Sequence, residues 1–299
     1  ALANGEVNAA ADLSRISSAQ INQSQYDVTT AAVNNGVYAL FNVTREVLKD
    51  KTVRQALQHG TDVAAVRAQL GGDVRSLDLP FINRQVTGDL PAVRAYNVDE
   101  AKRLLDSAGW LLDGTVRKKA GVEMKLTVVT TKDGDYEAVL ETLAGQWREL
   151  GISIDTQVYD PTDVSQRFIQ DILQPRTYDV LIRLLPIGAD PDVFAYWHSS
   201  QATSRGSNFS NYANAISDDA LASARTRIEP TLRNAKYVTF ARQWVADAPA
   251  IGLYQAATRY VSSKNAVSFD SLNSLVSSVD RYADVLYWSV GERPVFKTP

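Results

Sequence analysis

The sequence predicts an α/β fold in which helices flank a mixed sheet. Its clearest unit is residues 122–159, where an alternating apolar run is followed by a helical period from Gly134 and by a second alternating run after Gly151. A strand, a helix and a strand with short connections predict a right-handed parallel crossover. A helix over Asp163–Leu173 and a strand over Tyr178–Leu184 extend this pattern. With 299 residues and 45% hydrophobic content, the chain has room for one large domain or two.

Shorter elements are predicted before this unit. The first residues read as turns and a polar stretch rich in Ser, Gln and Asn, followed by a strand over Val37–Val43. Residues 50–71 have the pattern of two short helices that are broken at Gly60–Thr61. From Pro80 to Pro91 the chain reads as a loop, in which Phe81–Ile82 is a candidate buried anchor.

Two helices and two strands are predicted toward the C-terminus. Ser217 is a good N-cap for a helix that continues through Arg227. A second helix over Leu232–Ala246 ends before a proline, which cannot continue it. Two separate strands follow, at Ile251–Tyr254 and Tyr260–Ser262.

Composition excludes several classes of function. A net charge of −3 without a basic run argues against nucleic acid as a partner. The chain has no cysteine, which excludes thiol catalysis, disulfides and cysteine metal sites. No apolar run reaches the roughly 18 residues that a membrane-spanning helix needs. The 299 residues contain no signal-peptide or lipidation-box pattern.

The stretch Tyr96–Trp110, YNVDEAKRLLDSAGW, is the most informative segment of the chain. Asn97 is a good helix N-cap, and Glu100 three residues later completes a capping-box pattern. Gly109 stands where a left-handed C-cap is needed, so that Trp110 can fold back over the last turn. This combination of residues is rarer than any of its parts.

Four segments occur in the order typical of one protein family. They are VRQALQHGTD at 53–62, the Tyr96–Trp110 segment, the Tyr-Asp strand with its Asp-Pro-Asp turn and closing NFSNY over 178–212, and WVADAPAIGLY at 244–254. Together they resemble the family 5 solute-binding proteins of ABC importers, which include oligopeptide, dipeptide and nickel receptors. The opening ALANGEVNA is also similar to a segment that closes the family's N-terminal lobe.

This resemblance implies a periplasmic-binding-protein-like type II fold. Residues 46–262 would form the C-terminal α/β lobe, while 1–45 would be the tail of the N-terminal lobe and 263–299 a segment that returns to it. Full-length members are far longer, so the chain is expected to lack most of the N-terminal lobe. The family implies an ABC permease as partner, export from the cytoplasm as a lipoprotein or into the periplasm, a lipid anchor outside this chain, and a monomer.

The strand end near residue 184 is the best candidate for ligand contact, because ligand sites in α/β sheets favour this edge. Arg183 has a guanidinium that suits a ligand carboxylate, although a salt bridge within the protein is the simpler explanation. Leu185, Ile187 and Asp190 belong to the loop that follows. In peptide-binding relatives this loop supplies an acid for the ligand's ammonium group, and that position corresponds to Ile187 here. Asp190 is alternatively the N-cap of a helix over Pro191–His198.

Asn208, Phe209 and Tyr212 offer an amide and two aromatic rings beside the same loop. Such groups suit a peptide backbone or a sugar ring, and they equally suit internal packing. The five tryptophans are spread along the chain and are expected to lie mostly in the core.

Catalytic and metal sites are not expected. Asp190 and Asp192 point in different directions at a helix start and have no neighbouring His or Glu to complete a site. His59 is expected to end a helix, and His198 to hydrogen-bond in the loop that follows it. We therefore expect a receptor without enzymatic activity or cofactor that binds a solute, an oligopeptide first of all. The alternatives are a sugar or other specialised solute, or the ligand-sensing domain of a transcription regulator.

Overall fold

A mixed seven-stranded sheet runs through the computed structural model, which describes residues 1–2, 4–13, 21–71, 74–264, 266–267, 275–283 and 285–290. Within these residues the strand order is β1-β10-β2-β9-β7-β8, and β3 also pairs with β10. The strands are β1 Ala9–Ala10, β2 Tyr26–Phe41, β3 Arg75–Ser76, β7 Lys125–Thr131, β8 Ser153–Tyr159, β9 Val180–Pro186 and β10 Ala250–Ser263.

The predicted parallel crossover is present as β7, α5 (Gly134–Glu149) and β8. Strands β7 and β8 pair in parallel from Lys125 opposite Ser153 to Thr131 opposite Tyr159. The side chain of Asp133 accepts hydrogen bonds from the first backbone amides of α5, which explains why the helix begins there. The class predicted from the sequence, a mixed α/β sheet flanked by helices, is therefore confirmed.

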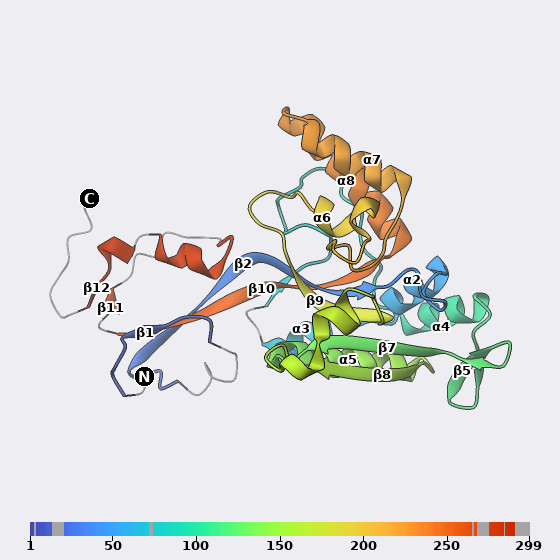
Figure 1. The fold of residues 1–299 in the computed structure, drawn as a ribbon, viewed down its shortest axis with the longest axis horizontal. Helices are drawn as coiled ribbons and strands as arrows, with labels where there is room; N and C mark the ends of the chain where they lie inside the picture. Colours follow the sequence, from blue (N-terminus) through green and yellow to red (C-terminus); the bar gives the residue numbers. More distant parts are fainter. Residues whose placement is uncertain are drawn as a thin grey trace.

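Helices cover both faces of this sheet (Figure 1). One face packs against α2 (Lys51–His59), α3 (Val63–Leu70), α4 (Val98–Ser107) and α5. The other face packs against α6 (Phe194–Trp197), α7 (Ala215–Thr226), α8 (Pro230–Asp247) and the loop that carries Phe81. Strand β2 serves both cores because successive side chains of a strand point to opposite faces. Val37 and Phe41 lie in one core, while Tyr38 lies in the other.

The two longest strands form a ribbon that leaves the helix-covered sheet. Strands β2 and β10 pair antiparallel from Leu40 opposite Ala250 to Tyr26 opposite Ser263. Figure 1 shows them running side by side toward β1, β11 (Ala266–Val267) and β12 (Ser289–Val290). The ladder has two register shifts near Gly252 and Gln255. The ribbon corrects two predictions, since the Val37–Val43 strand begins at Tyr26 and the two strands expected over 251–262 are one.

Smaller elements complete the described chain. A separate three-stranded sheet comprises β4 Leu111–Asp113, β5 Val116–Lys119 and β6 Val122–Glu123. Short 3-10 turns are η1 Val164–Gln166, η3 Ser199–Gln201, η4 Ser278–Tyr282 and η5 Val285–Tyr287. Much of the predicted return segment 263–299, and residues 14–20 of the predicted polar stretch, lie outside the described residues.

Two helix predictions are wrong in detail. The helix expected over Asp163–Leu173 is the short turn η1 followed by η2 (Phe168–Leu173), a π-helical turn, with Arg167 between them in the left-handed region at φ 44°. Asn214, not Ser217, caps α7, because its side chain accepts from the amides of Ile216 and Ser217. Ser217 is buried, and its hydroxyl contacts a tyrosine hydroxyl instead.

The Tyr96–Trp110 segment folds largely as its residues predict. Asn97 caps α4 by accepting from the amide of Glu100 at 3.0 Å, although the Glu100 carboxylate pairs with Arg103 and does not close a capping box. At the other end, Gly109 has φ +84°, and the amide of Trp110 donates to the carbonyl of Leu105 at 3.0 Å. This is a Schellman ending, and it places the Trp110 ring in the same core as Leu105.

We expect the two glycines Gly109 and Gly145 to respond oppositely to alanine. Gly109→Ala should lower the free energy of unfolding by about 1 kcal/mol, because an L side chain is strained at positive φ. Gly145 lies inside α5, where an added methyl group meets no atom within 4 Å, so Gly145→Ala should raise it by about 0.5–1 kcal/mol. Urea denaturation of both variants measures these changes. Equal effects of the two substitutions would contradict the backbone argument.

Candidate functional site

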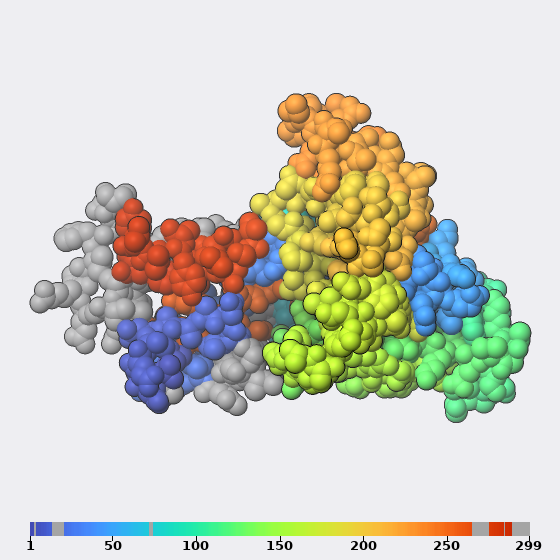
Figure 2. Space-filling model, viewed as in Figure 1, coloured from blue at the N-terminus to red at the C-terminus, as the bar shows by residue number. Residues whose placement is uncertain are grey.

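Two clefts lie near the ends of the central strands, on the side from which the ribbon leaves the sheet. The ribbon cleft has a volume of about 790 Å³ and is lined by Asn34, Arg75, Ser76, Ile82, Asn83, Arg84, Gln85, Ala189, Gln255 and Val276. The edge cleft has a volume of about 450 Å³ and is lined by Thr131, Asp160, Pro161, Asp163, Val164, Arg167, Phe168, Ile169, Gln170 and Arg183. In Figure 2 the surface is hollowed where the red C-terminal segment faces the yellow and lime parts of the chain.

The loop after β9 is anchored beside the ribbon cleft. The carbonyl oxygen of Asn34 accepts hydrogen bonds from the amides of both Ile187 and Gly188, each at 3.0 Å. Gln85 Nε2 donates to the Gly188 carbonyl at 2.8 Å from the opposite side. The β2 residue Asn34 lies at a register shift, where β2 has more residues than the facing part of β10. The irregularity in the ribbon therefore positions the loop that the sequence singled out.

Leu185 and Ile187 do not present side chains for a ligand. Both are buried in the core beneath α6, α7 and α8. Asp190 is half-exposed and forms a two-pronged ion pair with Arg233 of α8, with both oxygen–nitrogen distances at 2.6 Å. This hydrogen bonding holds the pKa of Asp190 below its usual value. The carboxylate thus fixes the loop to α8 and has its charge neutralised.

The structure also corrects the prediction that Asp190 caps a helix over Pro191–His198. The helix α6 is shorter, Phe194–Trp197, and the carboxylate that accepts from the amide of Phe194 belongs to Asp192. Asp192 is in turn paired with Arg225 at 2.8 Å. Both aspartates therefore hold the α7–α8 pair against the loop, which explains their spacing without catalysis.

Arg183 is the one predicted residue that lines a cleft, and it does so at the edge cleft. Its guanidinium lies 5.2 Å from the centre of the Phe209 ring, and Arg176 lies 5.1 Å from the same ring. Burial lowers the pKa of Arg183 from its usual value. Within the described residues no carboxylate is within ion-pairing distance of Arg183, so the salt bridge considered from the sequence is not formed. Arg183 therefore brings a positive charge without a carboxylate partner to the wall of the edge cleft.

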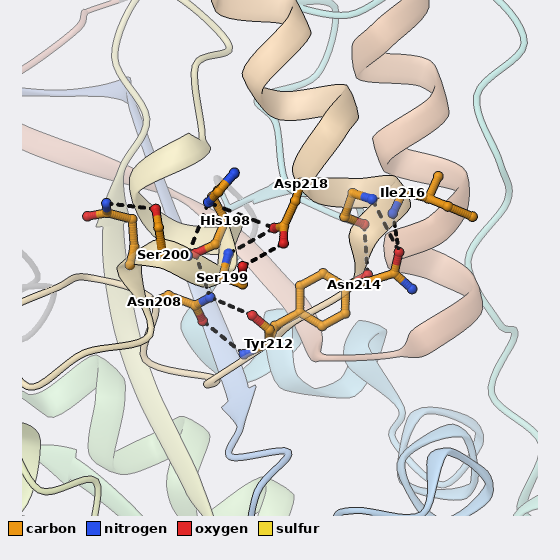
Figure 3. Close-up of polar contacts among 10 residues, drawn as sticks. His198, Ser199, Ser200, Asn208, Tyr212, Asn214, Ile216 and Asp218 are labelled. Atoms are coloured by element: carbon orange, nitrogen blue, oxygen red, sulfur yellow. Dashed lines mark hydrogen bonds and ion pairs between the residues drawn. The ribbon is translucent and has the colours of Figure 1, made fainter.

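The side chain of Asn208 is hydrogen-bonded to the backbone of Tyr212 (Figure 3). Asn208 Oδ1 accepts from the amide of Tyr212 at 3.1 Å, and its Nδ2 donates to the carbonyls of Tyr212 and His198. The Tyr212 hydroxyl donates to the Asp247 carboxylate at 2.8 Å. Both side chains are buried, and desolvation raises the pKa of Tyr212 far above its usual value. These two residues stabilise the turn between α6 and α7, and neither is among the residues that line the two clefts.

A serine, a histidine and an aspartate meet in the same view without forming a catalytic arrangement. Ser199 Oγ donates to the carboxylate of Asp218 at 2.5 Å, so it is not bonded to an imidazole. His198 Nδ1 accepts from the amide of Ser200 at 3.1 Å, as Figure 3 shows. The expected local hydrogen bond of His198 is therefore confirmed, while the serine has no base to activate it. His59 likewise ends α2 and contacts the carbonyl of Ala95 at 2.8 Å.

Among the described residues no three His, Asp or Glu side chains gather in a way that could hold a metal ion. In the same part of the chain no helix is both long and apolar enough to span a bilayer.

The ribbon cleft is the part of the site that sequence reasoning missed. Its residues come from six separate segments of the chain, and the motif-bearing loop contributes Ala189 among them. A signal was present, because the polar run Asn34-Asn35-Gly36 stands between two apolar stretches of β2 and Gln255 interrupts an apolar stretch of the strand opposite. Polar residues at such central positions indicate a bulge or a binding surface.

Comparison with known proteins identifies relatives over most of the chain. Residues 1–206 match the model of the family described as bacterial extracellular solute-binding proteins, family 5 Middle. The oligopeptide-binding protein AppA of Bacillus subtilis is 27% identical over 228 residues, which are 73% of this chain and 41% of that protein. OppA of Lactococcus lactis is 30% identical over 116 residues, which are 36% of this chain and 19% of that protein.

Solved structures agree on the fold. The structure of B. subtilis AppA in complex with a nonapeptide superposes with a TM-score of 0.82 at 20% identity, covering 97% of this chain and 57% of that one. NikZ of Campylobacter jejuni in complex with Ni(L-His) gives a TM-score of 0.82 at 21% identity, covering 96% and 58%. The chain thus spans between two fifths and three fifths of the length of these relatives, apart from the shorter match to OppA.

We expect Asn208→Ala to act on stability and not on binding. The substitution leaves the Tyr212 amide and two carbonyls without a partner in a buried site, which should lower the free energy of unfolding by about 2 kcal/mol. Asn8→Ala, at an exposed asparagine, is the matched control and should change it by less than about 0.5 kcal/mol. Denaturant titration gives both values. Loss of solute affinity at unchanged stability would return Asn208 to the ligand-contact set.

Proposed function

The chain belongs to the family 5 bacterial extracellular solute-binding proteins, and on this premise we propose that it is part of the solute receptor of an ABC importer. One observation carries the proposal. Two clefts flank the end of β9, and the strands that leave the sheet beside them lead to a second, smaller group of elements. Ligand sites of open α/β sheets lie beyond the carboxyl ends of their strands.

We propose that the receptor has two lobes and that this chain supplies one of them. Residues 46–262 would form the C-terminal lobe, with 1–45 and 263–299 belonging to the other. The partial coverage of the solved relatives supports this division. The ribbon of β2 and β10 would then be the connection between the lobes, and hinge closure about it would bury the solute and report the loaded state to the permease.

An oligopeptide is the solute class that we favour. AppA of B. subtilis was solved with a nonapeptide, and DppA of Helicobacter pylori with the peptide STSA. The ribbon cleft is lined mainly by polar groups and the edge cleft by polar and apolar groups together, and the polar groups suit a peptide backbone. A sugar or another specialised solute is the second possibility, since NikZ was solved with Ni(L-His). A ligand-sensing domain of a transcription regulator is the third.

The remaining features follow from this role. We propose that the protein acts outside the cytoplasmic membrane as a monomer, held there as a lipoprotein or free in the periplasm, and passes its solute to the permease subunits. We assign it no reaction and no cofactor. A lipobox upstream of this chain in the full-length gene would support the receptor, whereas a helix-turn-helix module would favour the regulator.

Native mass spectrometry of the full-length protein, purified without added ligand, tests the receptor role. A series of bound masses that fragment as peptides is the expected result. One discrete hexose-containing mass would replace peptide by sugar. Purification without any bound mass, together with no binding to a peptide library, would contradict the receptor assignment.

Arg183→Gln should lower the affinity for the bound solute about tenfold, because Arg183 lines the edge cleft without a carboxylate partner in the described chain. Arg227→Gln is the control, since Arg227 is exposed at the end of α7. Isothermal titration calorimetry of both variants gives the comparison. Equal affinities for the two variants would exclude Arg183 from the site.

A further inference from the structure

The charged residues that line the ribbon cleft are all positive. Of its ten lining residues, Arg75 and Arg84 carry positive charge and none carries a carboxylate. Both arginines are exposed, and neither has an ion pair or side-chain hydrogen bond among the described residues. By contrast, Arg67 is paired with Asp78 and Arg233 with Asp190.

Neighbouring carboxylates do not compensate this charge. Asp78 and Asp190 are held by the arginines just named, at 2.7 and 2.6 Å. Asp280, beside Val276, uses Oδ2 to accept from the amides of Val276 and Ser277 at 2.8 Å. Because guanidinium groups keep their charge at all physiological pH values, the described wall of the cleft is cationic.

The floor of the cleft also carries side-chain amide groups whose hydrogen-bonding atoms have few or no partners among the described residues. Asn34 is only 9% exposed, yet its side-chain amide makes no hydrogen bond within the described residues. Gln255 is similarly buried, and its Nε2 donates to the carbonyl of Val33 at 3.0 Å, which leaves Oε1 free in the described chain. Neither group is among the fully buried polar atoms that lack a partner, so these amide atoms keep contact with the open cleft and are available to a ligand there.

Arg84 is held in place by its own backbone. Its φ of +76° is uncommon for a residue with a side chain, and such strain tends to persist at functional positions. The turn that imposes it is closed by Gln85, whose amide donates to the Ile82 carbonyl and whose side chain accepts from the Ile82 amide at 3.0 Å. Asn83 in the same turn donates to the Ser76 carbonyl, which ties the turn to β3 and to Arg75.

From these observations we propose that the ribbon cleft is the subsite for a carboxylate of the solute. Arg75 and Arg84 would bind the carboxylate from the two sides of the cleft mouth, and Asn34 would donate to it, or to the adjacent amide, from the floor. For a peptide, the group is the C-terminal carboxylate or an acidic side chain. This assignment rests on the proposed solute-binding function and names the chemistry of one end of the ligand.

The test compares matched pairs of peptides that differ only in this group. Calorimetric titration of the full-length protein uses tetra-alanine as the free acid and as the C-terminal amide, and Ala-Glu-Ala-Ala amide against Ala-Gln-Ala-Ala amide. We expect at least one carboxylate-bearing member to bind about tenfold more tightly than its neutral partner, and this preference to shrink when the salt concentration is raised.

The arginines are then changed one at a time. Arg75→Gln and Arg84→Gln should each reduce the preference for the carboxylate about fivefold or more while leaving the affinity of the neutral peptide unchanged. The control variant Arg227→Gln, far from the cleft at the exposed end of α7, should keep the full preference. Circular dichroism and the affinity for the neutral peptide show that each variant is folded.

Two outcomes overturn the assignment. One is the absence of any carboxylate preference in the unmodified protein, including the case where neither series binds. The other is a preference that survives in Arg75→Gln, Arg84→Gln and their double variant. Failure of the receptor role is recognised separately, because it requires that native mass spectrometry finds no bound solute of any kind and that no member of a peptide library binds.

Discussion

The antiparallel pairing of β2 with β10 is the interaction on which the rest of the structure depends. It begins within the core, where Leu40 lies opposite Ala250, and it continues to Tyr26 opposite Ser263 at the far end. Strand β2 also pairs with β9, so the same backbone fixes the loop beyond Pro186. The register shifts in this ladder place Asn34 where its carbonyl holds that loop. Sheet, ribbon and clefts therefore share one hydrogen-bonded frame.

The crossover around α5 and the end of α4 were predictable because each depends on residues that lie close together in the sequence. The crossover around α5 follows from alternating and helical apolar periods, and Gly109 ends α4 because only glycine adopts its φ without strain. The lengths of β2 and β10 were not predictable in this way. The register shifts break the alternation, so each strand reads as a shorter element flanked by polar residues. Only the partner strand shows that the chain remains extended.

In the candidate site, too, the role of a side chain could be predicted where it depends on neighbouring residues and could not where it depends on distant parts of the chain. Asn208 and Tyr212 are residue types that bind ligands or satisfy one another, and the sequence cannot distinguish these uses because the partners Asp247 and His198 come from the tertiary fold. The prediction that Ser217 caps α7 was wrong for a similar reason. Asn214 is equally able to cap α7, and the tyrosine hydroxyl determines which of the two is free to do so. Arg183 lies in β9, the strand that the sequence predicts before the loop, but its contact with the Phe209 ring could not be predicted.

An open cleft with unpartnered polar groups has an energetic consequence for closure. While water fills the ribbon cleft, Asn34 and the two arginines remain solvated, and their lack of protein partners costs little. Closure over an empty cleft would remove that water and leave a buried amide and two charges unsatisfied, at a cost of about 1–3 kcal/mol for the amide alone and more for the charges. A solute that supplies acceptors offsets this cost. In the proposed receptor, the unpaired groups would make closure conditional on the ligand, which is the property that such a receptor requires to distinguish its loaded from its empty state.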